Sequence, residues 1–113
     1  MKKIGICFLL SLFLPLYAFG AQVFGSLKYG RGSVGQGAEI RIQCGENEKP
    51  AQATTDTYGS YSVFVRRSGR CKLTVGLKGK WTEPFYIYSD ATDPVRYDFE
   101  LLNVNGALTL RRR

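Results

Sequence analysis

The chain has 113 residues, a formal net charge of +7 and no histidine. A chain of this length forms one domain. The lack of histidine excludes Ser-His-Asp and Cys-His catalysis and removes the commonest zinc ligand. Since the sequence also lacks a glycine-rich phosphate loop and a Cys-x-x-Cys motif, we predict a protein that is not an enzyme and needs no cofactor or metal.

The N-terminal segment, residues 1–20, has the three-part pattern of an export signal. Lys2 and Lys3 provide a positive start, an uncharged apolar run follows, and Ala18-Phe19-Gly20 places small residues where a signal peptidase acts. We therefore expect cleavage after this segment and a secreted or periplasmic mature domain of residues 21–113.

An uncleaved membrane anchor is the alternative. Residues 4–27 carry no charge, and about 20 apolar residues span a bilayer. The dense apolar run, however, ends near Leu16, which argues against a membrane span. A lipid anchor is not expected either, because Cys7 precedes the apolar core of the segment, whereas a lipoprotein cysteine follows it. The membrane is thus expected as a partner only if the signal segment is kept.

Cleavage would leave 93 residues, lower the formal charge to +5 and keep two of the three cysteines. A domain of this size buries roughly two thirds of its unfolded surface and is only marginally stable. In an oxidising compartment we expect Cys44 and Cys71 to form a disulfide. By the chain-entropy model, closing that loop contributes about 3.5 kcal/mol. The alternative is two buried free thiols.

The mature sequence alternates apolar and polar residues between frequent glycines, as short strands joined by turns do. A glycine-rich loop is expected at 30–37, and Asn105-Gly106 predicts a hairpin turn before a last strand. The other expected strands, in chain order, are residues 22–29, 38–44, 51–55, 60–66, 71–76, 85–89 and 95–101.

Two of these strands carry a cysteine on the apolar face. Cys44 alternates in step with Ile40 and Ile42, and Cys71 in step with Leu73. Because successive side chains of a strand point to opposite faces, both sulfurs are expected in the core.

The stretch TTDTYGSYSVFV predicts a turn that leads into a strand. Asp56 can accept hydrogen bonds from backbone amides two residues ahead, and Gly59 tolerates a positive φ. Tyr61, Val63 and Val65 then share one face.

These elements predict an all-β fold, a small antiparallel β-sandwich of seven or eight strands with one disulfide. A closed barrel built from the same strands is the alternative.

Residues 22–79 resemble the carboxypeptidase regulatory-like, or transthyretin-like, domain. The matching pieces are Val34–Ala38, the Thr-Asp-x-x-Gly-x-Tyr pattern at 55–61, and the glycine turn Ser68–Cys71. The family often has proline where Ser33 and Ser68 stand, and the cysteine pair is not a general feature of it. The resemblance implies a β-sandwich without catalytic machinery that serves as a binding or structural module, with a fold similar to that of some starch-binding domains.

Two pairs of acids could carry chemistry. Asp98 and Glu100 fall on one strand face, as a glycosidase pair would, but Arg96 beside them favours a solvated polar face. Asp90 and Asp93 could ligate calcium, although a turn with Asx hydrogen bonds explains them better.

The candidate ligand surface is basic and aromatic. Residues 58–81 contain six Lys or Arg and no acid, and aromatic rings with nearby cations suit an acidic sugar. Alternatively, Trp81 caps the core, the tyrosines pair across strands and the basic residues protect strand edges. The candidate residues are Trp81, Tyr86, Tyr88, Arg66, Arg67, Lys78 and Lys80.

The sequence therefore predicts an exported interaction or structural module whose partner is another envelope or extracellular protein, or alternatively a module for acidic glycans. Nucleic acid is not expected as a partner of an exported protein, although charge alone permits weak, salt-sensitive binding. The Arg111–Arg113 tail is interpreted as a soluble end rather than an anion site.

Overall fold

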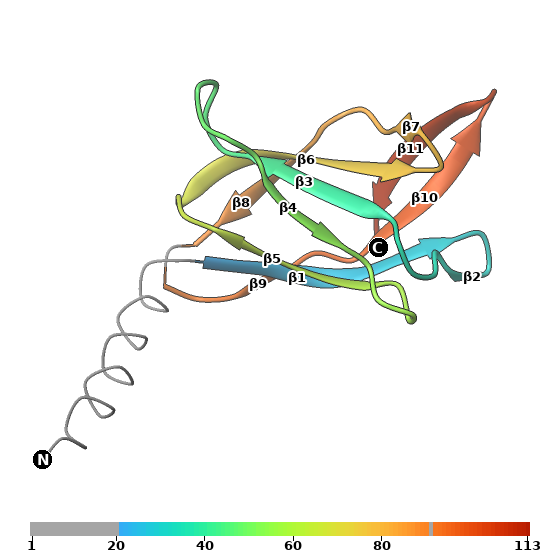
Figure 1. Ribbon diagram of the computed structural model, residues 1–113, viewed down its shortest axis with the longest axis horizontal. Helices are drawn as coiled ribbons and strands as arrows, with labels where there is room; N and C mark the ends of the chain where they lie inside the picture. Colours follow the sequence, from blue (N-terminus) through green and yellow to red (C-terminus); the bar gives the residue numbers. More distant parts are fainter. Residues whose placement is uncertain (1–20, 91) are drawn as a thin grey trace, which may run out of the picture.

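The computed structural model describes residues 21–90 and 92–113, which form two stacked β-sheets (Figure 1). The predicted export signal lies outside the described residues. Within them there is no helix long and apolar enough to cross a membrane. The strands are β1 (Ala21–Tyr29), β2 (Gly32–Ser33), β3 (Glu39–Gln43), β4 (Ala51–Thr54), β5 (Ser60–Val65), β6 (Gly69–Leu77), β7 (Lys80–Trp81), β8 (Phe85–Ser89), β9 (Val95–Arg96), β10 (Phe99–Val104) and β11 (Ala107–Arg112).

β1 is the central strand of the first sheet, which we call sheet one. β5 and β2 pair with β1 in antiparallel fashion, whereas β9 and β10 pair with it in parallel, and β11 completes the sheet beyond β10. The first strand of the domain therefore lies next to the C-terminal β10–β11 hairpin. The parallel pairing departs from the purely antiparallel arrangement expected from the sequence, because it joins strands too far apart in the chain for local patterns to reveal.

The second sheet, sheet two, has the order β4-β3-β6-β7, with β8 also paired to β6. Leu73 of β6 pairs with Ile42 of β3 and with Phe85 of β8. β7 and β8 thus share the edge of β6 that faces away from β3. All pairings in sheet two are antiparallel.

The all-β sandwich is confirmed, and its eight longer strands match the predicted ones. Three further strands, β2, β7 and β9, have two residues each. The expected strand 95–101 was wrong in one respect: it is divided into β9 and β10. Between them, Asp98 accepts the hydrogen bond of the Ser26 amide with its side chain, so the regular backbone ladder is interrupted there.

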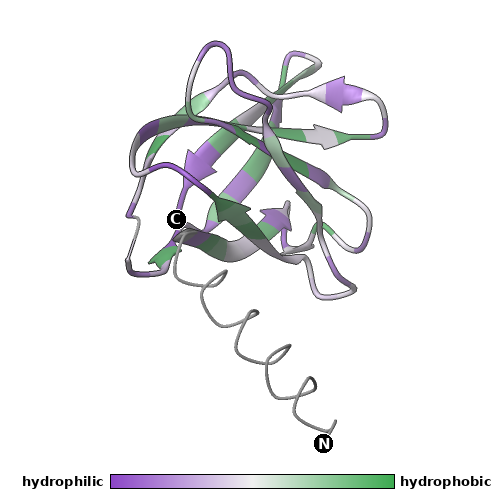
Figure 2. Cartoon of the chain, turned by 60° about the vertical axis from the view of Figure 1, so that its left-hand side comes forward, coloured by the Kyte–Doolittle hydropathy of each residue, from purple (hydrophilic) through white to green (hydrophobic). Residues whose placement is uncertain are grey.

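The core lies between the two sheets and is built from alternate residues of the long strands. Figure 2 shows hydrophobic and hydrophilic segments following one another along several of the strands. Tyr61, Val63 and Val65 are buried, as predicted, while Ser62 and Phe64 are exposed.

The predicted disulfide joins Cys44 to Cys71, with 4.2 Å between their Cα atoms. Cys44 and Cys71 occupy the next opposite positions after Gln43 and Lys72 in the antiparallel pairing of β3 with β6. The disulfide therefore links neighbouring strands of one sheet, on the side of the sheet that faces the core. Cys71 is buried and Cys44 partly so.

Two predicted turns are also confirmed. Asp56 accepts hydrogen bonds from the Tyr58 and Ser60 amides at 2.9 and 3.0 Å, and Gly59 has φ +79°. In the β10–β11 hairpin, Asn105 and Gly106 both have positive φ, as the tight hairpin turn requires.

Candidate functional site

The structure divides the candidate ligand residues among three places. Arg66 and Arg67 follow β5 and line a depression of about 380 Å³ at one end of the sandwich, where Arg67 pairs with Glu48 at 2.7 Å. Lys78 and Lys80 belong to the turn and strand at the far end of β6. The cations chosen from the sequence are therefore not one cluster.

The three candidate aromatic residues, by contrast, share the outer face of sheet two. Trp81, Tyr86 and Tyr88 are 38%, 49% and 61% exposed. In the pairing of β8 with β6, Tyr86 lies opposite Lys72 and Tyr88 lies opposite Arg70. The tyrosines thus pair across strands, as the alternative interpretation expected, yet remain open to solvent.

Trp81 lies flat against β6 because its partner there is a glycine. A Cβ placed on Gly76 would lie 2.8 Å from ring atoms of Trp81, so no larger residue fits beneath the indole. The Arg41 guanidinium lies 4.3 Å from the centroid of the Trp81 ring. Trp81 is therefore part of a cation–π pair on the outer surface and not a cap of the core.

A second pair of the same kind lies farther along β6. The Arg70 guanidinium is 4.0 Å from the centroid of the Tyr86 ring. We call the outer surface that holds both pairs the basic-aromatic face, and it consists of Arg41, Arg70, Lys72, Trp81, Tyr86 and Tyr88.

The cations of this face are not among the candidate ligand residues predicted from the sequence. Arg70 and Lys72 belong to the basic run 58–81 but were not chosen, and Arg41 lies outside that run. Strand alternation could have selected Arg70 and Lys72, because both point away from the core. Only the pairing of β3 with β6 brings Arg41 toward Trp81.

Two adjoining depressions are recessed into this face. The larger, of about 440 Å³, is lined by Arg41, Gln43, Glu46, Pro50, Lys72, Thr74 and Pro84. The smaller, of about 210 Å³, is lined by Gln43, Cys44, Gly45, Glu46, Arg70, Cys71, Lys72 and Tyr86.

Two arginines of sheet one have carboxylate partners. On sheet one, Arg96 pairs with Asp98 at 3.1 Å and Arg111 pairs with Glu100 at 2.6 Å. None of the cations of the basic-aromatic face lies within 4 Å of a carboxylate in the described residues. These cations are therefore available to an anionic ligand.

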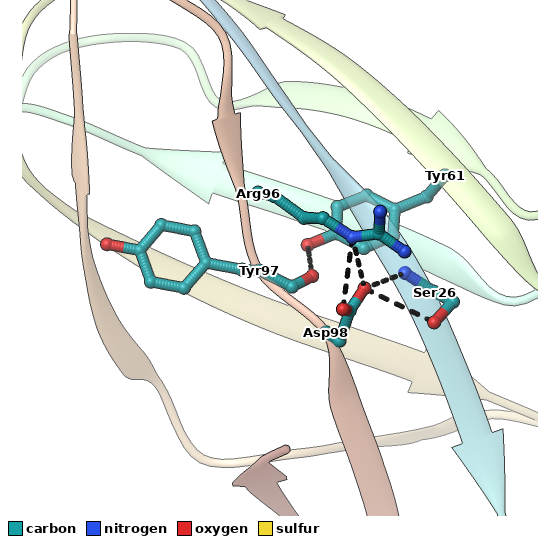
Figure 3. A network of polar contacts seen from close by, with 5 residues as sticks. All are labelled: Ser26, Tyr61, Arg96, Tyr97 and Asp98. Atoms are coloured by element: carbon teal, nitrogen blue, oxygen red, sulfur yellow. Dashed lines mark hydrogen bonds and ion pairs between the residues drawn. The ribbon is translucent and has the colours of Figure 1, made fainter.

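Asp98 and Glu100, the acid pair considered from the sequence, are both engaged. Figure 3 shows Asp98 between Ser26 and Arg96. Burial acts to raise the pKa of Asp98, but the Ser26 amide and the Arg96 guanidinium outweigh burial and hold that pKa below its ordinary value. A glycosidase general acid needs the opposite shift, so this geometry does not favour hydrolysis.

The loop acid Asp90 forms the predicted Asx turn. Its Oδ1 accepts hydrogen bonds from the amide and the hydroxyl of Thr92, both at 3.0 Å. These bonds, the amide foremost, lower the pKa of Asp90. Across residues 21–90 and 92–113, no three Cys, Asp or Glu side chains gather in a way that could hold a metal ion.

Comparison with known proteins shows likeness of fold alone. No family model and no curated protein matches the chain. A DUF3823 family protein from Parabacteroides merdae superimposes with a TM-score of 0.52 at 11% identity, over 82% of this chain and 46% of that one. A protein from Eubacterium rectale gives 0.52 and 11% over 83% and 88%. The chain thus spans less than half of the Parabacteroides protein.

Proposed function

We propose that the protein is an exported, non-catalytic β-sandwich module that binds an acidic glycan through the basic-aromatic face. The observation that carries this proposal is the pair of arginine–aromatic stacks, Arg41 with Trp81 and Arg70 with Tyr86, whose arginines form no ion pair within the described residues. Aromatic rings pack against the C–H surfaces of sugars, and arginine and lysine bind carboxylates by charge-assisted hydrogen bonds.

Other features support the exported, non-catalytic part of the proposal. The Cys44–Cys71 disulfide is typical of proteins in an oxidising compartment. The N-terminal signal pattern predicts export to such a compartment. The resemblance to carboxypeptidase regulatory-like domains implies a binding or structural role, and we keep that family assignment as part of the proposal.

Fluorescence of Trp81, the only tryptophan in the chain, provides the direct test. Titration with oligogalacturonate should change its emission, and affinity should fall as salt rises because charge screening weakens the ion contacts. Arg41→Gln should weaken binding roughly tenfold, the equivalent of about 1.4 kcal/mol. Calorimetry should show that Trp81→Ala also loses affinity.

The matched control is Phe64→Ala, which removes an aromatic side chain that is 64% exposed on the outer face of sheet one. Its affinity should equal that of the parent protein. If a broad panel of acidic and neutral oligosaccharides leaves Trp81 emission and calorimetric heat unchanged, the glycan proposal is wrong.

An envelope protein is the second candidate partner, favoured by the edge strand β4, whose only strand pairing among the described residues is with β3. An extended segment of a partner could add to such an edge. By contrast, the Tyr88 amide on the β8 edge is already engaged, because it donates a hydrogen bond to the Tyr97 hydroxyl at 2.9 Å. A stoichiometric partner in crosslinked pull-downs, not displaced by oligogalacturonate, would favour this second function.

A further inference from the structure

Lys72 is common to both depressions of the basic-aromatic face. Gln43 and Glu46 line both as well, whereas Arg41 lines only the larger and Arg70 only the smaller. Each depression therefore has one arginine of its own and shares one lysine, one amide and one carboxylate with its neighbour.

We propose that the two depressions are adjacent subsites for two acidic residues of one linear uronic-acid glycan, with Lys72 serving both. This inference rests on the proposed function and adds the ligand class and the minimum ligand length. In the pairing of β3 with β6, Arg41 lies opposite Thr74. Thr74 is four positions beyond Arg70 on β6, so the two arginines are separated by about four residues along the strand direction. At about 3.3 Å per residue this is roughly 13 Å, longer than one sugar ring.

The shared polar groups favour a glycan over other polyanions. The Gln43 Nε2 atom donates to the carbonyl oxygens of Gly45 and Glu48 at 2.5 Å, which holds the amide in place. No donor to Gln43 Oε1 is found among the described residues, so this oxygen and the exposed Glu46 carboxylate can accept hydrogen bonds from ligand hydroxyl groups.

A uronic-acid chain offers both kinds of group that the face requires. Its carboxylates would meet Lys72 and an arginine, and its ring hydroxyls would meet Gln43 and Glu46. An acidic peptide has the carboxylates but no row of hydroxyl groups.

The test is calorimetric titration of the protein with galacturonic acid and its oligomers up to the hexamer. Affinity should rise at least roughly tenfold between monomer and trimer and then level off, because a second subsite becomes filled. Arg41→Gln and Arg70→Gln should each reduce the affinity for the trimer toward the parent's affinity for the monomer. Lys72→Gln should reduce it further than either.

Lys28→Gln is the matched control, because it removes the same charge from the outer side of sheet one, where Lys28 is next to Glu100. It should bind the trimer as the parent does, and each variant should keep the parent's unfolding midpoint. Equal affinity for monomer and trimer would overturn the two-subsite inference while leaving the proposed function intact. Equal competition by hexaglutamate would overturn the choice of a glycan, and failure of every uronate to bind would overturn both proposals.

Discussion

Asp98 organises the place where the pairing of β1 passes from β9 to β10. Its Oδ1 accepts the Ser26 amide at 2.9 Å and the Ser26 hydroxyl at 3.3 Å, and its Oδ2 lies 3.1 Å from Arg96 Nε. All three partners favour the ionised carboxylate. Although burial opposes them, the net effect is a pKa below the ordinary value, so the folded state prefers charged Asp98.

The depressed pKa of Asp98 predicts a specific pH dependence of stability. Its contribution should be complete above the unfolded-state pKa, about 3.9, and should be lost as pH falls through the lower folded-state pKa. Asp98→Asn should therefore lower the free energy of unfolding by about 1–2 kcal/mol near pH 6. That difference should shrink at acid pH, as measured by urea unfolding at a series of pH values.

The control for Asp98 is Glu83→Gln, since Glu83 is exposed and forms no ion pair within the described part of the chain. Its stability should follow that of the parent protein across the series. An Asp98→Asn difference that stayed constant down to the lowest pH would contradict the explanation from ionisation.

At the scale of elements, the junction of β1 with β9 and β10 depends on a close backbone contact. A Cβ on Gly25 would lie 1.8 Å from the Tyr97 carbonyl oxygen. That oxygen accepts the Tyr61 hydroxyl at 2.7 Å (Figure 3), and burial of Tyr61 raises the pKa of its hydroxyl well above the ordinary value. β1, β5 and the C-terminal strands therefore meet at one buried point.

Gly25→Ala should disrupt this junction. Because the added methyl group overlaps a fixed backbone oxygen, we expect a loss of about 3 kcal/mol in the free energy of unfolding, at the upper end for overpacked sites. Gly32→Ala in β2 is the control, since nothing lies within 4 Å of its Cβ position. Urea denaturation compares the two, and similar midpoints would show that the junction relaxes around the methyl group.

At the scale of the whole molecule, two small sheets share one thin core, and the first and last described strands, β1 and β11, belong to the same sheet. Residues 21–113 are few enough that burial of apolar surface leaves little excess stability. The disulfide links β3 to β6 within sheet two, while sheet one relies on strand pairing, packing and surface ion pairs. The covalent bond thus also holds the two strands that carry Arg41 and Lys72 in register.

Removal of the disulfide should lower the stability of the whole domain. The double variant Cys44→Ala/Cys71→Ala should lose about 3.5 kcal/mol in free energy of unfolding, because the unfolded chain regains the entropy of an open loop. Treating the parent protein with dithiothreitol should give a similar loss, measured by urea denaturation. The intact mass of the untreated protein should be two hydrogens below that of the reduced form, and an unchanged midpoint after reduction would contradict the prediction.

The sequence by itself determined which side chains face the core and where the chain turns. These properties depend on neighbours within a few residues: alternation assigned Cys44 and Cys71 to the inner side, and local chemistry placed turns at Asp56 and Asn105. Tertiary structure alone decided which strands are neighbours, because that depends on contacts between distant segments. It divided the strand at Tyr97–Asp98, separated Arg66 and Arg67 from the aromatic side chains, and set Arg41 over Trp81 above Gly76.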